Sequence, residues 1–159
     1  MWRPAIPEDH GRVVELYLAL YREDPGSIPP DPSRARRTLE LFQETPARGL
    51  CLVLEQDGQV DGYALLVPYW SNELGGLICT LDELYVERRA RGRGRATELL
   101  RLLEDGALGW EPPAALELEV SRANARGRAL YLRAGFRPVE NDTLRKALPG
   151  APRGVDRSG

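Results

Sequence analysis

Runs of apolar residues, separated by polar breaks, predict the helices and strands in the first part of the chain. An apolar run over 2–6 has the length of a strand, and the stretch 7–20 continues with a proline, two acidic residues and apolar residues at helical spacing. Proline and polar residues fill 24–32, which predicts a loop, and the pattern of 33–44 predicts a second helix. Strand, helix, loop and helix are therefore expected in this order.

The middle of the chain has the pattern of strands. The apolar runs 50–55 and 60–67 flank an Asp-Gly pair, and this combination predicts a β-hairpin. The polar stretch 69–76 predicts a loop, and the long run 77–86 after it predicts a further strand.

Helices and strands alternate in the remainder. We expect a helix over 94–108, a strand over 114–120, a helix over 124–134 that Gly135 ends, and closing strands over 136–139 and 143–148. The order β-α-α-β-β-β-α-β-α-β predicts an α+β fold, in which a mixed, mostly antiparallel central sheet is flanked by helices as an α/β/α sandwich.

Length and charge limit the function. At 159 residues the chain can bury a core, and we expect one domain over 1–148 followed by a flexible polar tail over 149–159. The formal net charge of −2 argues against a dedicated nucleic-acid-binding protein, because no excess of positive charge would drive binding to phosphates. No stretch approaches the roughly 20 apolar residues of a membrane span, and residues 1–4 do not resemble a signal peptide, so a cytoplasmic location is expected.

Metal and histidine chemistry are not indicated. Cys51 and Cys79 lie in apolar runs typical of strands, which favours small buried side chains over metal ligands or a disulfide. His10 is the only histidine and has no partner motif. We therefore expect no metal cofactor and no histidine-based catalytic triad.

Arginines and glycines alternate over 91–95, between the strand that ends at Val86 and the next helix. A glycine-rich turn at a helix N-terminus presents unpaired backbone N–H groups beside the positive end of the helix dipole, and this arrangement binds phosphate or pyrophosphate. A Walker loop is excluded because the only lysine, Lys146, lies far away, and a dinucleotide fingerprint is disfavoured because Thr97 occupies its third small-residue position. An arginine-rich surface turn and an RNA contact are the alternatives.

Two motifs resemble the signatures of the GNAT acyl-CoA N-acyltransferase superfamily. The first, Arg91-x-x-Gly94-x-Ala96, is similar to the motif whose backbone amides hold the pyrophosphate of coenzyme A. The second lies within 116–136 and reads Asn-x2-Gly-x3-Tyr-x3-Gly-Phe, with Gly127 in the place of the usual alanine. Because both occur in the family's order, the resemblance implies the GNAT fold and acetyl-CoA as the acyl donor.

The resemblance also implies how acetyl-CoA would be bound. The backbone at the end of the central strand would hold the pantetheine amides and polarise the thioester carbonyl, and the amides of the glycine-rich turn would hold the pyrophosphate. Asn124 would contact the pantetheine arm or cap its own helix, and the sequence leaves both roles open. The expected cofactor-binding residues are Leu84, Tyr85, Val86, Arg91, Gly92, Arg93, Gly94, Arg95, Ala96, Asn124 and Tyr131.

Acetyl transfer to an amine needs a base for the ammonium proton and an acid for the departing thiolate. Tyr131 matches the family's tyrosine near the thioester sulfur and is the candidate acid; a tyrosine that only positions the sulfur is the alternative. Asp82 and Glu83 resemble the acidic pair of the diamine-acetyltransferase branch, and the spacing of Glu119 to Tyr131 resembles the base of the ribosomal-protein N-terminal acetyltransferases. These three carboxylates are the candidate bases, and ordered water is the alternative.

Side chains alternate along a strand, so two of these carboxylates are expected on opposite faces of the sheet. Asp82 would share one face with Thr80, Leu84 and Val86, and Glu83 would share the other with Leu81 and Tyr85.

The acceptor is less well defined by the sequence. Tyr69, Trp70, Glu73 and Asp82 are candidates for lining its pocket, and several carboxylates near a cleft would attract a cationic amine. We expect a small primary amine; the alternatives are a peptide or protein N-terminus, a lysine side chain, or no acceptor in a non-catalytic acyl-CoA-binding module. No nucleic-acid or membrane partner is expected, and a homodimer is one assembly that the sequence allows.

Overall fold

The computed structural model describes residues 1–106, 109–140, 143–152 and 155, so the predicted tail lies partly outside the described residues. The strands are β1 (Trp2–Pro4), β2 (Leu50–Gln56), β3 (Gln59–Ser71), β4 (Gly76–Val86) and β5 (Ala115–Leu118). The helices are α1 (His10–Glu23), α2 (Pro32–Glu44), α3 (Arg95–Glu104) and α4 (Ala125–Arg133), with short 3₁₀ turns at Pro7–Asp9 and Arg88–Ala90. Within these ranges, no helix is long and apolar enough to cross a membrane.

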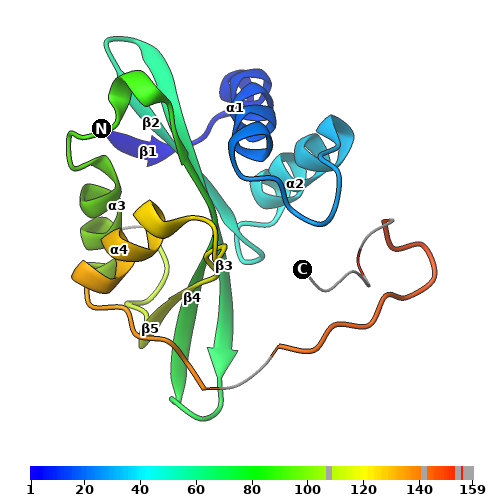
Figure 1. Cartoon of the computed structure of the whole chain (residues 1–159), viewed down its shortest axis with the longest axis vertical. Coiled ribbons are helices and arrows are strands. Elements are labelled where there is room, and N and C mark those ends of the chain that lie inside the picture. The colour runs from blue at the N-terminus through cyan, green and yellow to red at the C-terminus, as the bar shows by residue number, and fades with distance from the viewer. Residues whose placement is uncertain (107–108, 141–142, 153–154, 156–159) are drawn as a thin grey trace.

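A five-stranded sheet with the order β1-β2-β3-β4-β5 forms the centre of the molecule (Figure 1). Neighbouring strands from β1 to β4 are antiparallel, and β5 is parallel to β4. Helices α1 and α2 cover one face of the sheet, and α3 and α4 cover the other (Figure 1). The predicted α+β fold, with a mixed and mostly antiparallel sheet between helices, is confirmed.

Two apolar cores hold the helices to the sheet. On one face, Leu99 and Leu103 of α3 pack in a buried cluster with Leu52 of β2. On the other face, Leu16 of α1 packs in a second cluster with Val53, the next residue of the same strand. Strand β2 is therefore buried on both faces, which explains its continuous apolar run.

One extra residue interrupts the ladder between β3 and β4. Leu65 pairs with Glu83 while the adjacent Leu66 pairs with Leu81, so Asp82 has no opposite residue and forms a β-bulge. A bulge shifts the alternation of side chains by one residue. Leu81 accordingly packs in the core beneath α3, and the prediction that it shares a face with Glu83 was wrong.

Two predicted features of the sheet differ in the structure. Strands β3 and β4 continue into the predicted loop over 69–76, and a tight turn at 72–75 joins them. The predicted closing strands over 136–139 and 143–148 are not strands, and Figure 1 shows this segment leaving the sheet. Pro138 has no N–H to donate to a ladder, which disfavours a strand there.

The helix ends were predicted with mixed success. Helix α4 stops just before Gly135, whose φ of 99° fits the predicted glycine at the end of the helix. Helix α3 ends at Glu104 rather than at residue 108, and residues 107–108 lie outside the described ranges.

The buried carboxylate of Asp9 ties the N-terminal strand to α1. It accepts hydrogen bonds from both terminal nitrogens of Arg3 (2.7 and 3.1 Å) and from the N–H of Ile6 (2.9 Å). Urea unfolding of Asp9→Asn should show a loss of about 2 kcal/mol in the free energy of unfolding, because Arg3 keeps its charge and loses one of its two carboxylate partners, so that only Glu55 remains. Asp57→Asn in the exposed β2–β3 turn is the matched control, and an equal loss in both variants would refute the role of the pair.

The Asp9 pair also has a defined pH dependence. Hydrogen bonding to Arg3 lowers the pKa of Asp9 in the folded protein. The stabilisation is therefore fully present above the ordinary aspartate pKa of about 3.9 and is lost as the pH falls through the lowered folded pKa. The stability difference between the wild type and Asp9→Asn should accordingly shrink in acid.

Candidate active site

Strand β4 extends beyond its parallel partner. The pairing of β4 with β5 ends where Leu81 lies opposite Leu118, whereas β4 continues to Val86. Over this last stretch, none of the strands in the described part of the chain pairs with the outer edge of β4. A ligand that carries amide groups can pair with such an edge as a further strand would.

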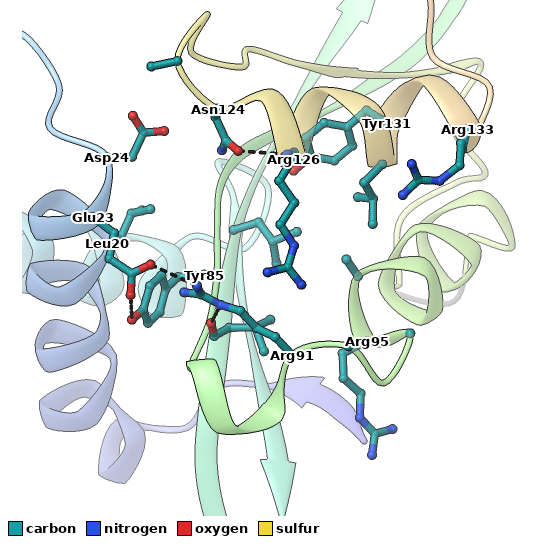
Figure 2. Close-up of a pocket in the computed structure, with 18 residues that line it drawn as sticks. Leu20, Glu23, Asp24, Tyr85, Arg91, Arg95, Asn124, Arg126, Tyr131 and Arg133 are labelled. Carbon is teal, nitrogen blue, oxygen red and sulfur yellow. Dashed lines mark hydrogen bonds and ion pairs between the residues drawn. The ribbon is translucent and has the colours of Figure 1, made fainter.

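A cavity of about 570 Å³ lies at this edge, between the ends of α1 and β4, the arginine-glycine turn, α3 and α4 (Figure 2). All the predicted cofactor-binding residues except Arg93 line it: Leu84, Tyr85, Val86, Arg91, Gly92, Gly94, Arg95, Ala96, Asn124 and Tyr131. The structure thus brings together residues from three segments of the chain.

The backbone of the turn has the geometry of an anion site. Gly92 and Gly94 have positive φ angles of 78° and 73°, which residues with a Cβ adopt only at a cost. Gly94 is the N-cap of α3, and the first hydrogen bond of the helix runs from the N–H of Glu98 to its carbonyl oxygen (2.9 Å). The N–H groups of Arg95 and Ala96 precede that bond and are oriented for a bound anion.

The arginine side chains of the turn are bound to the protein itself. Arg91 donates to the carbonyl oxygen of Val86 (2.6 Å) and to the carboxylate of Glu23 (3.0 Å), and its guanidinium lies 5.2 Å from the ring centroid of Tyr85. Arg95 donates to side-chain oxygens on β2 and α3 and points away from the cavity (Figure 2). The anion site is therefore mainly one of backbone amides.

Two arginines that the sequence analysis did not single out also line the cavity. Arg126 and Arg133 both lie on α4, and the guanidinium of Arg126 extends into the cavity (Figure 2). Their spacing of seven residues places them on one face of a helix, and this was the available signal in the sequence. They provide positive charge opposite the amide-rich turn.

Helix α4 also carries Tyr131 and Asn124. The ring of Tyr131 meets that of Phe136 edge-on with 5.7 Å between centroids, and burial raises the pKa of the Tyr131 phenol. Asn124 accepts a hydrogen bond from the N–H of Gly127 (2.8 Å) and so caps α4, which confirms one of the two roles left open. A Cβ at position 127 would lie 2.9 Å from the Asn124 side chain, so glycine leaves room for this cap.

A second pocket, of about 260 Å³, lies on the face of the sheet that α1 and α2 cover. Asp82 and Glu83 both line it, so the prediction that they lie on opposite faces of the sheet was wrong. Tyrosines that the sequence analysis missed lie next to them. The carboxylate of Glu83 accepts hydrogen bonds from the hydroxyls of Tyr63 (2.8 Å) and Tyr21 (3.2 Å), and burial nevertheless raises its pKa. The spacing of Tyr17 and Tyr21, four residues apart on one helix face, was a signal for this wall.

The other candidate base lies outside both cavities. Glu119 follows β5 with an exposed side chain and lines neither of them. Glu119 nevertheless influences Asp82. Burial is the main cause that raises the pKa of Asp82, the nearby negative charge of Glu119 raises it further, and the positive charge of Arg145 lowers it.

The aromatic candidates for the acceptor pocket lie elsewhere. Tyr69 pairs with Ile78 toward the turn end of the β3–β4 hairpin, and its hydroxyl donates to Glu117 (2.8 Å). Trp70 is exposed beside it, and Glu73 lies in the turn itself. None of these three side chains lines either cavity.

The described part of the chain contains no group of three or more His, Cys, Asp or Glu side chains placed to hold a metal ion. Cys51 and Cys79 are buried free thiols, and burial raises the pKa of Cys79 to about 11.

The chain is similar to known proteins. The sequence profile of the acetyltransferase (GNAT) family matches residues 13–136, and the chain belongs to that family. The chain is also 32% identical over 92 residues to the uncharacterized N-acetyltransferase YhfO of Bacillus subtilis (strain 168), a match that covers 58% of this chain and 59% of YhfO. The chain thus spans less than two thirds of the length of this curated relative.

Solved structures show the same fold. A possible acetyltransferase from Clostridium difficile 630 superimposes with a TM-score of 0.80 at 16% identity, over 93% of this chain and 97% of that one. A predicted acetyltransferase from Clostridium acetobutylicum, whose structure was determined with acetyl-CoA, gives a TM-score of 0.70 at 18% identity, over 92% and 95% of the two chains.

Proposed function

We propose that this protein is an N-acetyltransferase that moves an acetyl group from acetyl-CoA to a small primary amine by direct attack in a ternary complex. One observation carries the proposal: consecutive residues of β4 line two cavities. Asp82 and Glu83 line the pocket beneath α1 and α2, and Leu84 and Tyr85 line the cavity with the amide-rich turn. Donor and acceptor can therefore approach each other across one strand.

The larger cavity fits acetyl-CoA. The free edge of β4 suits the amides of the pantetheine arm, and the N–H groups at the start of α3 suit the pyrophosphate. Arg126 and Arg133 add positive charge for the phosphates. The solved structure of the Clostridium acetobutylicum protein with acetyl-CoA supports this donor for a chain of the same fold.

Chemistry at the acceptor requires a neutral amine. The acidic pair supports a cationic acceptor, as in the diamine acetyltransferases that it resembles. In our mechanism Glu83 attracts the ammonium group and Asp82 takes its proton, directly or through a water molecule, because Asp82 lines the pocket and is partly open to solvent although protein atoms surround its carboxylate closely enough to raise its pKa. Glu119 raises the pKa of Asp82 without lining the pocket and is a positioning residue.

The amine nitrogen then bonds to the thioester carbon. A backbone N–H on the free edge of β4 stabilises the negative charge that develops on the carbonyl oxygen. When the carbon–sulfur bond breaks, the sulfur leaves with the electron pair, and the hydroxyl of Tyr131 donates a proton to it. The nitrogen releases its second proton to water as the amide forms, and the Tyr131 phenolate regains a proton from solvent. Burial raises the pKa of Tyr131, so the phenol holds this proton at neutral pH.

Thiol release from acetyl-CoA tests the proposal. The purified protein is incubated with polyamines, aminoglycosides, amino acids, simple alkylamines and short peptides, and we expect at least one small amine to exceed the enzyme-free rate. Faster acetylation of peptides than of every free amine would favour a peptide or protein acceptor. Binding of acetyl-CoA without turnover on any acceptor would favour a non-catalytic acyl-CoA-binding module.

A further inference from the structure

Among the described residues, the carboxylate of Glu83 has no positively charged partner. Its two hydrogen-bond donors, the hydroxyls of Tyr63 and Tyr21, are neutral groups. In the described part of the chain, no arginine, lysine or histidine lies within ion-pair distance of it. A carboxylate can accept about four hydrogen bonds, so Glu83 retains acceptor capacity for a cationic ligand.

The walls around this carboxylate are mainly apolar. The pocket extends from Glu83 along α1 and α2, and apart from the tyrosines its apolar lining consists of Val13, Ile28, Pro29, Ala35, Leu39, Leu65 and Pro152. Such walls favour a hydrocarbon or aromatic body, because burying apolar surface is favourable and burying an unpaired charge is costly.

The charged residue on the α2 side of the pocket is positive. Arg34 lines this side, where its guanidinium donates to the carbonyl oxygen of Pro29 and lies 3.8 Å from the carboxylate of Asp31. The other carboxylate that lines the pocket, Asp82, is next to Glu83 in β4 and so lies at the same end. A ligand with one ammonium group at this end and a second one farther along the pocket would place the second charge among apolar side chains and near Arg34. The pocket therefore disfavours a second cation.

We infer that the acceptor is a primary monoamine with an apolar aliphatic or aromatic body, whose ammonium group binds at Glu83 and whose body lies between α1 and α2. This inference rests on the proposed function and narrows its acceptor. It separates simple alkylamines and arylalkylamines from polyamines and aminoglycosides, which carry several positive charges.

A matched pair of acceptors tests the inference on the wild-type protein. Hexylamine and hexamethylenediamine have the same six-carbon body, and the diamine adds only a distal ammonium group. At saturating acetyl-CoA we expect kcat/KM to be about tenfold or more higher for hexylamine, and phenethylamine to behave like hexylamine. Equal or better turnover of the diamine, of spermidine or of an aminoglycoside would overturn the inference and leave the acetyltransferase proposal standing. No turnover of any acceptor would overturn both.

The role of Glu83 has a separate test. Glu83→Gln keeps the shape and removes the charge, and we expect KM for hexylamine to rise about tenfold or more while KM for acetyl-CoA stays constant. Glu44→Gln at the exposed end of α2 is the matched control and should leave both values unchanged. An unchanged amine KM in Glu83→Gln would overturn the assignment, and the wild-type comparison decides the acceptor class even if this variant does not fold.

Discussion

Tyr131→Phe is expected to lower kcat about 100-fold, at the low end of the range for a general acid. The substitution removes only the hydroxyl, and the phenyl ring keeps its edge-on contact with Phe136. Without the phenol the sulfur must leave as an unprotonated thiolate or take its proton from water. The rate of thiol release, measured with the best amine of the panel, reports this loss directly.

The same variant separates a catalytic tyrosine from one that only lines the cavity. The affinity for acetyl-CoA, measured by calorimetry, should stay within about twofold of the wild type, because most donor contacts in our mechanism are made by backbone amides. A loss of affinity with kcat unchanged would contradict the acid role and leave Tyr131 as a residue that positions the sulfur.

The parts of the fold that local sequence determines were predicted well. The Asp57-Gly58 turn and the glycines of the arginine-glycine turn all adopt the positive φ angles that such residues favour. The bulge at Asp82 was not predictable in the same way, because it depends on the register between β3 and β4 and not on either strand alone. The apolar residues over 136–139 and 143–148 similarly predicted strands. A local pattern does not ensure that such a segment pairs with a neighbouring strand, and these segments do not form strands.

The site residues that could be predicted are those that lie close together in the sequence. Ten of the residues that line the larger cavity could be predicted because the turn and the second motif each concentrate their functional residues within a short stretch, whereas Arg126 and Arg133 were not singled out. The environment of Glu83 was missed because Tyr21 and Tyr63 meet it only after α1 packs on the sheet. The direction of the Arg91 side chain likewise depends on Glu23, far away in the chain.

Asp82→Asn should lower kcat/KM for the amine about 100-fold at neutral pH, since the ammonium proton would lose its acceptor in the pocket. Asp57→Asn makes the same chemical change in an exposed turn and is expected to leave the rate unchanged. An equally small effect of both substitutions would remove Asp82 from the mechanism and favour ordered water. A large effect confined to KM, with kcat constant, would instead make Asp82 a second contributor to amine binding.

The pH profile gives Asp82 a signature that a structural role would not produce. Burial and the nearby charge of Glu119 raise the pKa of Asp82, while Arg145 lowers it, and the charges of Asp82 and Glu83 also repel each other. A base with a raised pKa loses activity at a higher pH as the solution is acidified.

Glu119→Gln removes one repelling charge, so the acid limb of kcat/KM should move to lower pH, whereas Arg145→Gln should move it to higher pH. Movement of both variants in the same direction would contradict Asp82 as the titrating base, because the two neighbours carry opposite charges.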